Sequence, residues 1–192
     1  LALQIKGKIT EIAKILRVNE ARLYEYFVYK SSFIPLKILL SLCKLLKLDE
    51  YQLERNIIAY RQHYSNSIIK EPKLPLKITP LTTFLTSHIY FDGSLPKDGS
   101  GTFYNNKSKG IMKDFIDSLM ETFGKVHYIK KLDHRGVLKC GMPRIIGEIL
   151  KYLYHIRSFA CKESEVSDFI LSLPYEHKLA FVIGALVDEG SV

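Results

Sequence analysis

Two segments of the chain, 97 residues apart, share a pattern that strongly limits how the protein can fold. FLTSHIYFDGSL occupies positions 84–95 and FVIGALVDEGSV occupies positions 181–192. In each segment an apolar run leads into the order acid, glycine, serine, aliphatic residue, so that Asp92 of the first copy matches Glu189 of the second. An internal repeat of this kind predicts two equivalent apolar helices.

Each copy also carries two small residues four positions apart. They are Thr83 and Ser87 in the first copy, and Ala180 and Gly184 in the second. On a helix this spacing places both residues on one face, where small side chains allow two backbones to approach closely. We therefore expect the two helices to pack through these residues and to end side by side.

Helices that end side by side bring Asp92 and Glu189 close together. Two neighbouring carboxylates repel each other unless a cation lies between them, and each helix C-terminus adds negative potential. We therefore expect both acids to bind Mg²⁺ (or Mn²⁺), which prefers oxygen ligands. Asp188 adjoins Glu189, and we treat it as secondary. His88 and His177 also lie near the motifs, where we favour a structural role over a catalytic one.

The motifs LTSHIYFDG and VIGALVDEG resemble those of the LAGLIDADG homing endonucleases, with Asp92 and Glu189 at the positions of the metal-binding acids. Two further segments, SGTFYNNKSKGIMKDFIDSLMETFGKV and CKESEVSDFILSLPYEHKLAFVIGALVDEGSV, resemble the archaeal branch of that family. The likeness covers about Leu81–Val192, and it departs from the family at Ser87, where glycine is usual.

This resemblance implies an α+β fold built from αββαββα repeats. The two motif helices would form the central interface, and each repeat would add a curved antiparallel sheet that lies over the DNA major groove. The implied reaction is metal-dependent hydrolysis of phosphodiester bonds in both DNA strands. Asp92 and Glu189 would hold Mg²⁺ against the scissile phosphates and polarise the attacking water. The family often has a basic residue near the active centre, for which Arg157 and Lys162 are the closest candidates.

The second copy of the pattern stands at the end of the sequence. Between the first copy and the segment PYEHK, which leads into the second motif helix, lie 78 residues, 96–173. No such stretch follows Val192 in this sequence. One hypothesis is that the sequence is part of a longer protein with a complete second repeat, which would act as a monomer. The other hypothesis is that the second repeat has decayed, so that its helix only covers the core. Such a protein would not cut DNA by itself, and a dimer is then possible.

A basic segment between the motifs, KVHYIKKLDHRGVLKCG, predicts a β-hairpin that turns near residues 133–136. A basic two-stranded ribbon suits a DNA major groove, although charge can also protect a solvated sheet edge. The net charge of +8 favours a polyanionic partner. The residues that we expect to contact DNA in this half of the chain are Lys97, Lys107, Lys125, His127, Lys130, Lys131, Arg135 and Lys139.

The sequence around this hairpin supplies ordinary elements of an α+β domain. SLPKDGSGTFYNN has the turn residues of another hairpin, and KSKGIMKDFIDSLMETF has apolar residues at helical spacing before Gly124. Pro143 begins a further amphipathic helix, PRIIGEILKYLYHI, whose apolar residues we expect in the core.

Residues 8–63 have the apolar spacing of helices, including ITEIAKIL and RVNEARLYEYF, the second with Asn19 as its N-cap. These segments, followed by SSFIPLKILLSLCKLLKLDEYQL, resemble the Xre/Cro-type helix-turn-helix family over about Ile9–Leu53. Arg17 replaces the usual turn glycine. In that family the second helix enters the major groove, so Arg22 and Tyr24 would contact DNA. The alternative is a small bundle that binds protein or caps the second domain.

We therefore predict a helix-turn-helix domain over 1–63, a proline-rich linker over 64–80 and an endonuclease-like domain over 81–192. The leading hypothesis is a site-specific, Mg²⁺-dependent DNA endonuclease, and the main alternative is a non-catalytic DNA-binding regulator built on the same fold. A helical protein–protein module is a third hypothesis, which the repeat disfavours. No apolar run approaches the length of a membrane span, and we expect a cytoplasmic, nucleoid-associated protein that binds double-stranded DNA.

Overall fold

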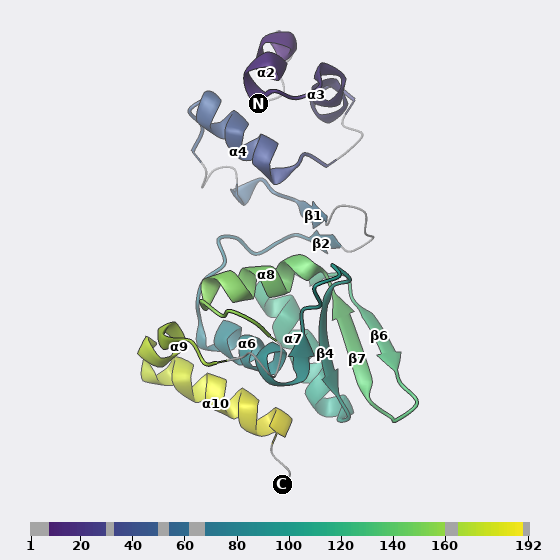
Figure 1. Cartoon of the computed structure of the whole chain (residues 1–192), viewed down its shortest axis with the longest axis vertical. Helices are drawn as coiled ribbons and strands as arrows, with labels where there is room; N and C mark the ends of the chain where they lie inside the picture. Colours follow the sequence, from purple (N-terminus) through teal and green to yellow (C-terminus); the bar gives the residue numbers. More distant parts are fainter. Residues whose placement is uncertain (1–7, 30–32, 50–53, 62–67, 160–164, 190–192) are drawn as a thin grey trace. The chain divides into compact units, whose positions relative to one another are not determined.

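The computed structural model describes residues 8–29, 33–49, 54–61, 68–159 and 165–189, and it combines α-helices with antiparallel β-sheets (Figure 1). The predicted α+β class is confirmed at this level. The chain divides into two compact units, Leu1–Asn56 and Ile57–Val192. No helix in these described ranges is both long enough and apolar enough to cross a membrane.

Among its described residues, the first unit contains the short helices α2 (Ile9–Leu16), α3 (Glu20–Phe27) and α4 (Leu36–Leu45). Between α2 and α3, Arg17 takes the left-handed conformation with φ of 53°, which glycine adopts more easily. The Asn19 side chain then caps α3 by accepting a hydrogen bond of 2.8 Å from the Ala21 N–H. The buried residues of this unit's core are Ile9, Ile12, Ala13, Leu23, Phe27 and Leu42.

A three-stranded antiparallel sheet occupies the segment where we predicted the last helix and the linker. Its strands are β1 (Ala59–Arg61), β2 (Ile68–Lys70) and β5 (Lys125–Val126), in the order β1-β2-β5. The prediction of helix up to residue 63 is therefore wrong at β1, because backbone pairing with β2 outweighs local helical preference. Residues 68–70 of the expected linker pair with β5 and belong to the second unit, which begins at Ile57.

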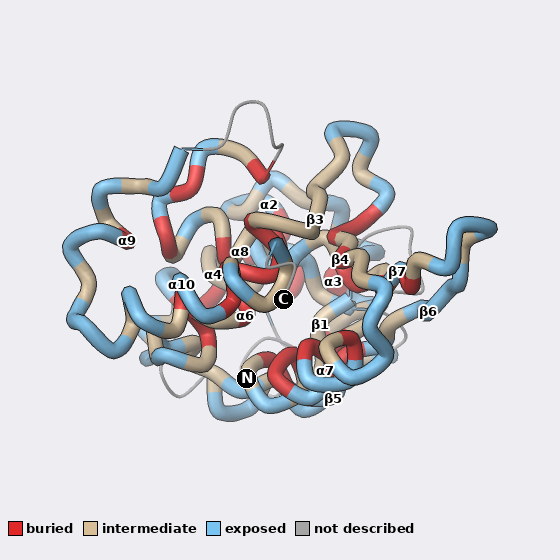
Figure 2. Tube along the Cα trace, turned by 90° about the horizontal axis from the view of Figure 1, so that it is seen from below, coloured by how far each residue is buried: buried red, intermediate tan, exposed pale blue. Residues whose placement is uncertain are grey.

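A four-stranded antiparallel sheet forms the other β layer of the second unit. Its strands are β3 (Gly93–Ser94), β4 (Thr102–Asn106), β6 (Ile129–Leu132) and β7 (Leu138–Met142), in the order β3-β4-β7-β6. Alternate residues of β4 and β7 are buried, as expected when one face of a sheet covers a core. Strand β6 is exposed along its whole length (Figure 2).

The helices that the structure describes in the second unit are α6 (Pro80–Asp92), α7 (Lys109–Phe123), α8 (Arg144–Leu153), α9 (Asp168–Ser172) and α10 (Tyr175–Glu189). Helix α6 begins with a capping box, in which Thr79 and Thr82 exchange hydrogen bonds. Helix α7 ends at Gly124, with φ of 95°, as the sequence predicts. The motif residues 190–192 lie outside the described residues.

Candidate functional site

Helices α6 and α10 pack together at their smallest side chains. The Ser87 hydroxyl donates a hydrogen bond of 2.6 Å across the interface to the Phe181 carbonyl oxygen. A Cβ atom added to Gly184 would lie 2.7 Å from Ser87 Oγ and 3.3 Å from the Phe84 carbonyl oxygen. Only glycine therefore permits this approach, and the close packing predicted from the sequence is found at Ser87 and Gly184.

Asp92 and Glu189 are the last residues of α6 and α10. Asp92 is half-buried and Glu189 is exposed. The pKa of Asp92 is raised to about 6, mainly by burial and further by the negative charges of Asp188 and Glu189, while His88 acts to lower it. The acids at the ends of the two helices therefore influence each other electrostatically.

Asn105 of β4 connects this acidic group to the four-stranded sheet. Its Nδ2 donates a hydrogen bond of 3.1 Å to the backbone carbonyl oxygen of Asp92. Asn105 lies opposite Lys139 of β7, and Lys139 lies opposite Lys131 of β6. Residues opposite each other project from the same face, so these three form a row across the exposed face of the sheet. Lys139 Nζ also lies 4.1 Å from the centroid of the Phe103 ring.

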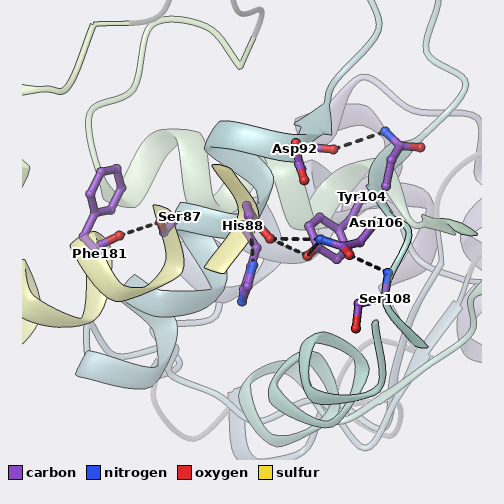
Figure 3. Close-up of polar contacts among 9 residues, drawn as sticks. Ser87, His88, Asp92, Tyr104, Asn106, Ser108 and Phe181 are labelled. Atoms are coloured by element: carbon purple, nitrogen blue, oxygen red, sulfur yellow. Dashed lines mark hydrogen bonds and ion pairs between the residues drawn. The ribbon is translucent and has the colours of Figure 1, made fainter. Parts of the chain in front are cut away.

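Asp188, which we treated as secondary, is instead the centre of a buried hydrogen-bond network with His88, Tyr104 and Asn106. Figure 3 shows these three partners. Its Oδ1 accepts hydrogen bonds from Tyr104 Oη at 2.6 Å and from Asn106 Nδ2 at 3.3 Å. Its Oδ2 accepts one from His88 Nδ1 at 2.8 Å, and the His88 and Asp188 side chains are 1% and 0% exposed.

This network was missed because its members are far apart in the sequence. Tyr104 and Asn106 precede Asp188 by more than 80 residues. Burial and the hydrogen bond to Asp188 raise the pKa of Tyr104, so its hydroxyl keeps its proton and remains a donor. The sequence did contain one signal, because Asp188 is a second acid at the end of an apolar helix. A carboxylate at such a position needs buried hydrogen-bond donors if it points inward.

The predicted DNA contacts of the second unit divide into two groups. Six of them are exposed on the β6–β7 hairpin or on the loops that flank β4: Lys97, Lys107, Lys130, Lys131, Arg135 and Lys139. The turn of the hairpin is held by Asp133, whose Oδ1 accepts hydrogen bonds from the backbone N–H groups of Arg135 at 2.8 Å and Val137 at 2.9 Å.

The other two, Lys125 and His127, are not on that hairpin. Lys125 lies in β5, and its Nζ forms an ion pair of 2.7 Å with Glu71. The backbone N–H of His127 donates to the Ile68 carbonyl oxygen, at 2.9 Å. The basic ribbon therefore begins at Ile129 rather than at Lys125, because residues 125–127 pair with β2 and join the three-stranded sheet.

The structure does not bring Arg157 into contact with the two acids in its described part. Arg157 is exposed and follows α8, and the nearby Tyr154 bonds to Thr83 in the first turn of α6 at 2.9 Å. Asp92 ends the same helix, about 13 Å further along its axis. His177 Nδ1 lies 3.2 Å from Thr83 Oγ1, also far from the acids along α6. Lys162 lies outside the described residues.

In the first unit, the expected contact residues of α3 are on its surface. Arg22 and Tyr24 are exposed, whereas Leu23 faces the core. Glu20 is half-buried, and its Oε1 accepts a hydrogen bond of 2.8 Å from the Thr10 hydroxyl. This contact joins α2 to the start of α3 and leaves Arg22 and Tyr24 accessible.

The described residues contain no group of three or more His, Cys, Asp or Glu side chains arranged to hold a metal ion. The candidate metal ligands at the ends of α6 and α10 are thus the two acids and their immediate neighbours. Comparison of the chain with protein-family models, with curated proteins and with solved structures found no match.

Proposed function

We propose that this protein is a site-specific, double-stranded DNA endonuclease of the LAGLIDADG type. The observation that carries the proposal is that Asp92 and Glu189, which the internal repeat matches, end two helices that pack at Gly184. The helices and the strands of the four-stranded sheet follow in the order α6, β3, β4, α7, β6, β7 and α8, with β5 of the other sheet between α7 and β6. Apart from β5, this order supports the αββαββα repeat that the sequence resemblance implies.

The chemistry of the helix ends suits Mg²⁺ or Mn²⁺. Asp92 and Glu189 supply carboxylate oxygens, and Asp188 adds to the negative potential that raises the Asp92 pKa. A divalent cation would offset this repulsion, with backbone, water and phosphate oxygens as its further ligands. When bound, it would activate water and neutralise charge on the phosphate. The protein's own part is to hold the two carboxylates together and to orient the DNA.

The exposed face of the four-stranded sheet is the proposed DNA-binding surface. Its row of Asn105, Lys139 and Lys131 begins at the Asp92 backbone and extends to the edge strand β6. Lysines contact phosphates and asparagine can read adenine, so the row combines both kinds of contact. In the full chain, Lys131→Ala and Lys139→Ala should each weaken DNA binding and reduce the slope of log affinity against log salt by about 1.

The three helices of the first unit would extend the DNA contact. Arg22 and Tyr24 are the exposed candidates on α3. If they bind DNA, Arg22→Ala should lower the affinity of the full chain and its salt dependence, while Lys14→Ala on α2 serves as a matched loss of one exposed charge. An Arg22→Ala affinity equal to that of Lys14→Ala would contradict this part of the proposal.

The direct test is cleavage of a plasmid library that carries randomised target sites, in the presence of Mg²⁺. The unsubstituted chain should linearise a defined subset of plasmids. Asp92→Asn and Glu189→Gln should each lower the cleavage rate by at least about 100-fold, because a cation ligand contributes to transition-state charge stabilisation. Cleavage that is equal in all three proteins would place the activity elsewhere and overturn the proposal.

A second candidate function is DNA binding without cleavage, as in a transcriptional regulator. It is favoured because the described residues include no three acidic, imidazole or thiol side chains arranged to hold a metal ion. This alternative predicts sequence-specific binding that needs no divalent cation and is unchanged in Asp92→Asn. Site selection on the same library, with EDTA and with Ca²⁺ in place of Mg²⁺, separates the two functions.

A further inference from the structure

The last turn of α10 is held by one buried carboxylate whose partners come from other elements. Asp188 bonds to His88 of α6 and to Tyr104 and Asn106 of β4. Asn106 Oδ1 in turn accepts a hydrogen bond of 2.8 Å from the backbone N–H of Ser108, the N-cap of α7 (Figure 3). A single side chain thus connects α10 directly to α6 and β4 and indirectly to α7.

This anchor occurs in only one copy of the repeat. The position that matches Asp188 in the first copy is Phe91, whose ring centroid lies 5.7 Å from that of Phe181. The position that matches His88 is Ala185 in the second copy. Helix α6 therefore has apolar packing where α10 has a buried ion and its hydrogen bonds.

Helix α10 needs such an anchor because it buries few apolar side chains. Phe181 and Gly184 are its buried residues in the structure. Neither lies in the last turn, where Asp188 makes hydrogen bonds to α6 and β4. The cost of burying a carboxylate is offset only while its donors stay in place, which ties the helix end to their positions.

The donors are themselves well fixed. The Tyr104 ring stacks on Phe115 with centroids 4.1 Å apart, and the His88 ring meets Phe115 edge-on at 5.8 Å. Within the described residues, His88 Nε2 is buried without a hydrogen-bond partner. The bond from His88 Nδ1 to Asp188 is therefore the hydrogen bond that orients this ring, and a carboxylate, which only accepts, requires the proton on Nδ1.

We propose that Asp188 is a positioning residue, which fixes the last turn of α10 against α6 and β4 and thereby sets the place of Glu189 relative to Asp92. The anchoring of α10 stands on the contacts alone. The consequence for a bound cation rests on the proposed function, in which Glu189 and Asp92 are its ligands.

The first test is amide hydrogen exchange in the full chain, comparing Asp188→Asn with Glu176→Gln, which removes an exposed acid from the first turn of the same helix. Asp188→Asn should speed the exchange of amides 185–189 by at least about tenfold, because hydrogen bonds to a charged group are lost. Exchange in α7 should stay close to that of Glu176→Gln. Equal exchange of amides 185–189 in both variants would overturn the proposal.

If Asp188→Asn does not fold, Tyr104→Phe and Asn106→Ala give the same test, since each removes one donor and leaves the carboxylate. Both variants should speed the exchange of amides 185–189, by a smaller factor than Asp188→Asn. The effect of Tyr104→Phe should be the larger of the two, because the bond from Tyr104 to Asp188 is shorter than that from Asn106. No change in either variant would likewise overturn the anchoring role.

The second test is Mn²⁺ affinity, measured by electron paramagnetic resonance on the same proteins. Asp188→Asn should bind Mn²⁺ about 10-fold more weakly than Glu176→Gln, as when a residue that orients a metal ligand is lost. Faster exchange with unchanged Mn²⁺ affinity would show that Asp188 holds the helix without positioning Glu189. If the unsubstituted chain binds no Mn²⁺, the proposed function and its cation site fail, while the exchange result still decides the anchoring role.

Discussion

Helices α6 and α10 carry matched sequences but lie in different surroundings. Leu85 and Ile89 of α6 are both 0% exposed, whereas the matching Val182 and Leu186 of α10 are 51% and 64% exposed. Helix α6 has buried residues on all its sides, while the buried residues of α10 are Phe181 and Gly184, together with the side chain of Asp188. The same apolar pattern can therefore form a central helix or a half-exposed one, depending on which elements pack against it.

The reason for the difference is the position of β4 and α7. Tyr104 and Phe115 belong to the same core cluster as Leu85 and Ile89, and α6 packs against α7 and β4 as well as against α10. In the described part of the chain, the corresponding side of α10 has no comparable cover, as the exposure of Leu186 shows. The contrast is open to experiment because the two helices offer residues of similar volume at matched positions.

The largest expected effect comes from truncating the matched pair Ile89 and Leu186. Ile89→Ala should lower the free energy of unfolding of the second unit by about 2–5 kcal/mol, because it leaves a cavity in a fully buried site. Leu186→Ala should change it by less than about 0.5 kcal/mol, as for an exposed residue. Chemical denaturation followed by circular dichroism measures both, and equal losses would mean that the α10 face is covered in solution.

A smaller effect is expected where the two helices touch. Gly184→Ala should cost about 1–3 kcal/mol, because the added methyl group would overlap Ser87. Gly110→Ala in the first turn of α7, where the nearest side-chain atom is 3.7 Å away, is the matched control and should not destabilise the protein. The double variant Ser87→Gly with Gly184→Ala should recover part of the loss, and no recovery would argue against direct contact.

The N-terminal end of α6 has a hydrogen bond that the matching Ala180 of α10 cannot make. Tyr154 donates to or accepts from Thr83 at 2.9 Å in a buried position. Tyr154→Phe should therefore cost about 0.5–1.5 kcal/mol of unfolding free energy. Tyr152→Phe, on an 82% exposed side chain of α8, should be neutral in the same thermal or chemical unfolding experiment, so a cost shared by both variants would argue against the buried bond.

The last prediction concerns the charge of Asp92 and its effect on stability as the pH changes. The pKa of Asp92 is raised to about 6 from 3.8, so its charge opposes folding above pH 6 and not below about pH 4. Asp92→Asn should thus stabilise the protein at pH 8, and the gain should fall as the pH drops through 6 and vanish near pH 4. Unfolding curves across this range measure the gain. A pH-independent gain in Asp92→Asn would contradict the assignment.

Several features were predictable because they depend on local sequence. The repeat predicted two helices in contact through Ser87 and Gly184, and helical spacing predicted α7 with its end at Gly124. The hairpin with its turn at Asp133 was predictable from turn residues. The repeat also predicted that Asp92 and Glu189, the candidate site residues, end their helices, and the structure confirms those positions.

Other features depend on pairing between distant segments, which no local pattern reports. Lys125 joins β2 rather than the basic hairpin because backbone pairing selects its partner across more than 50 residues. For the same reason residues 68–70 form a strand where composition indicated a linker. The role of Asp188 depends on donors from α6 and β4 that meet only after the chain has folded.

The sequence by itself thus determined the repeat, the helices and the acids at their ends, because periodicity and turn chemistry act between neighbours along the chain. Only the tertiary structure decided which copy is central, which acid is buried and which lysines share a face. Those outcomes depend on burial and strand register, which are properties of packing between segments far apart in sequence. The differing exposure of Leu85 and Val182, at matched positions of one repeat, shows this most directly.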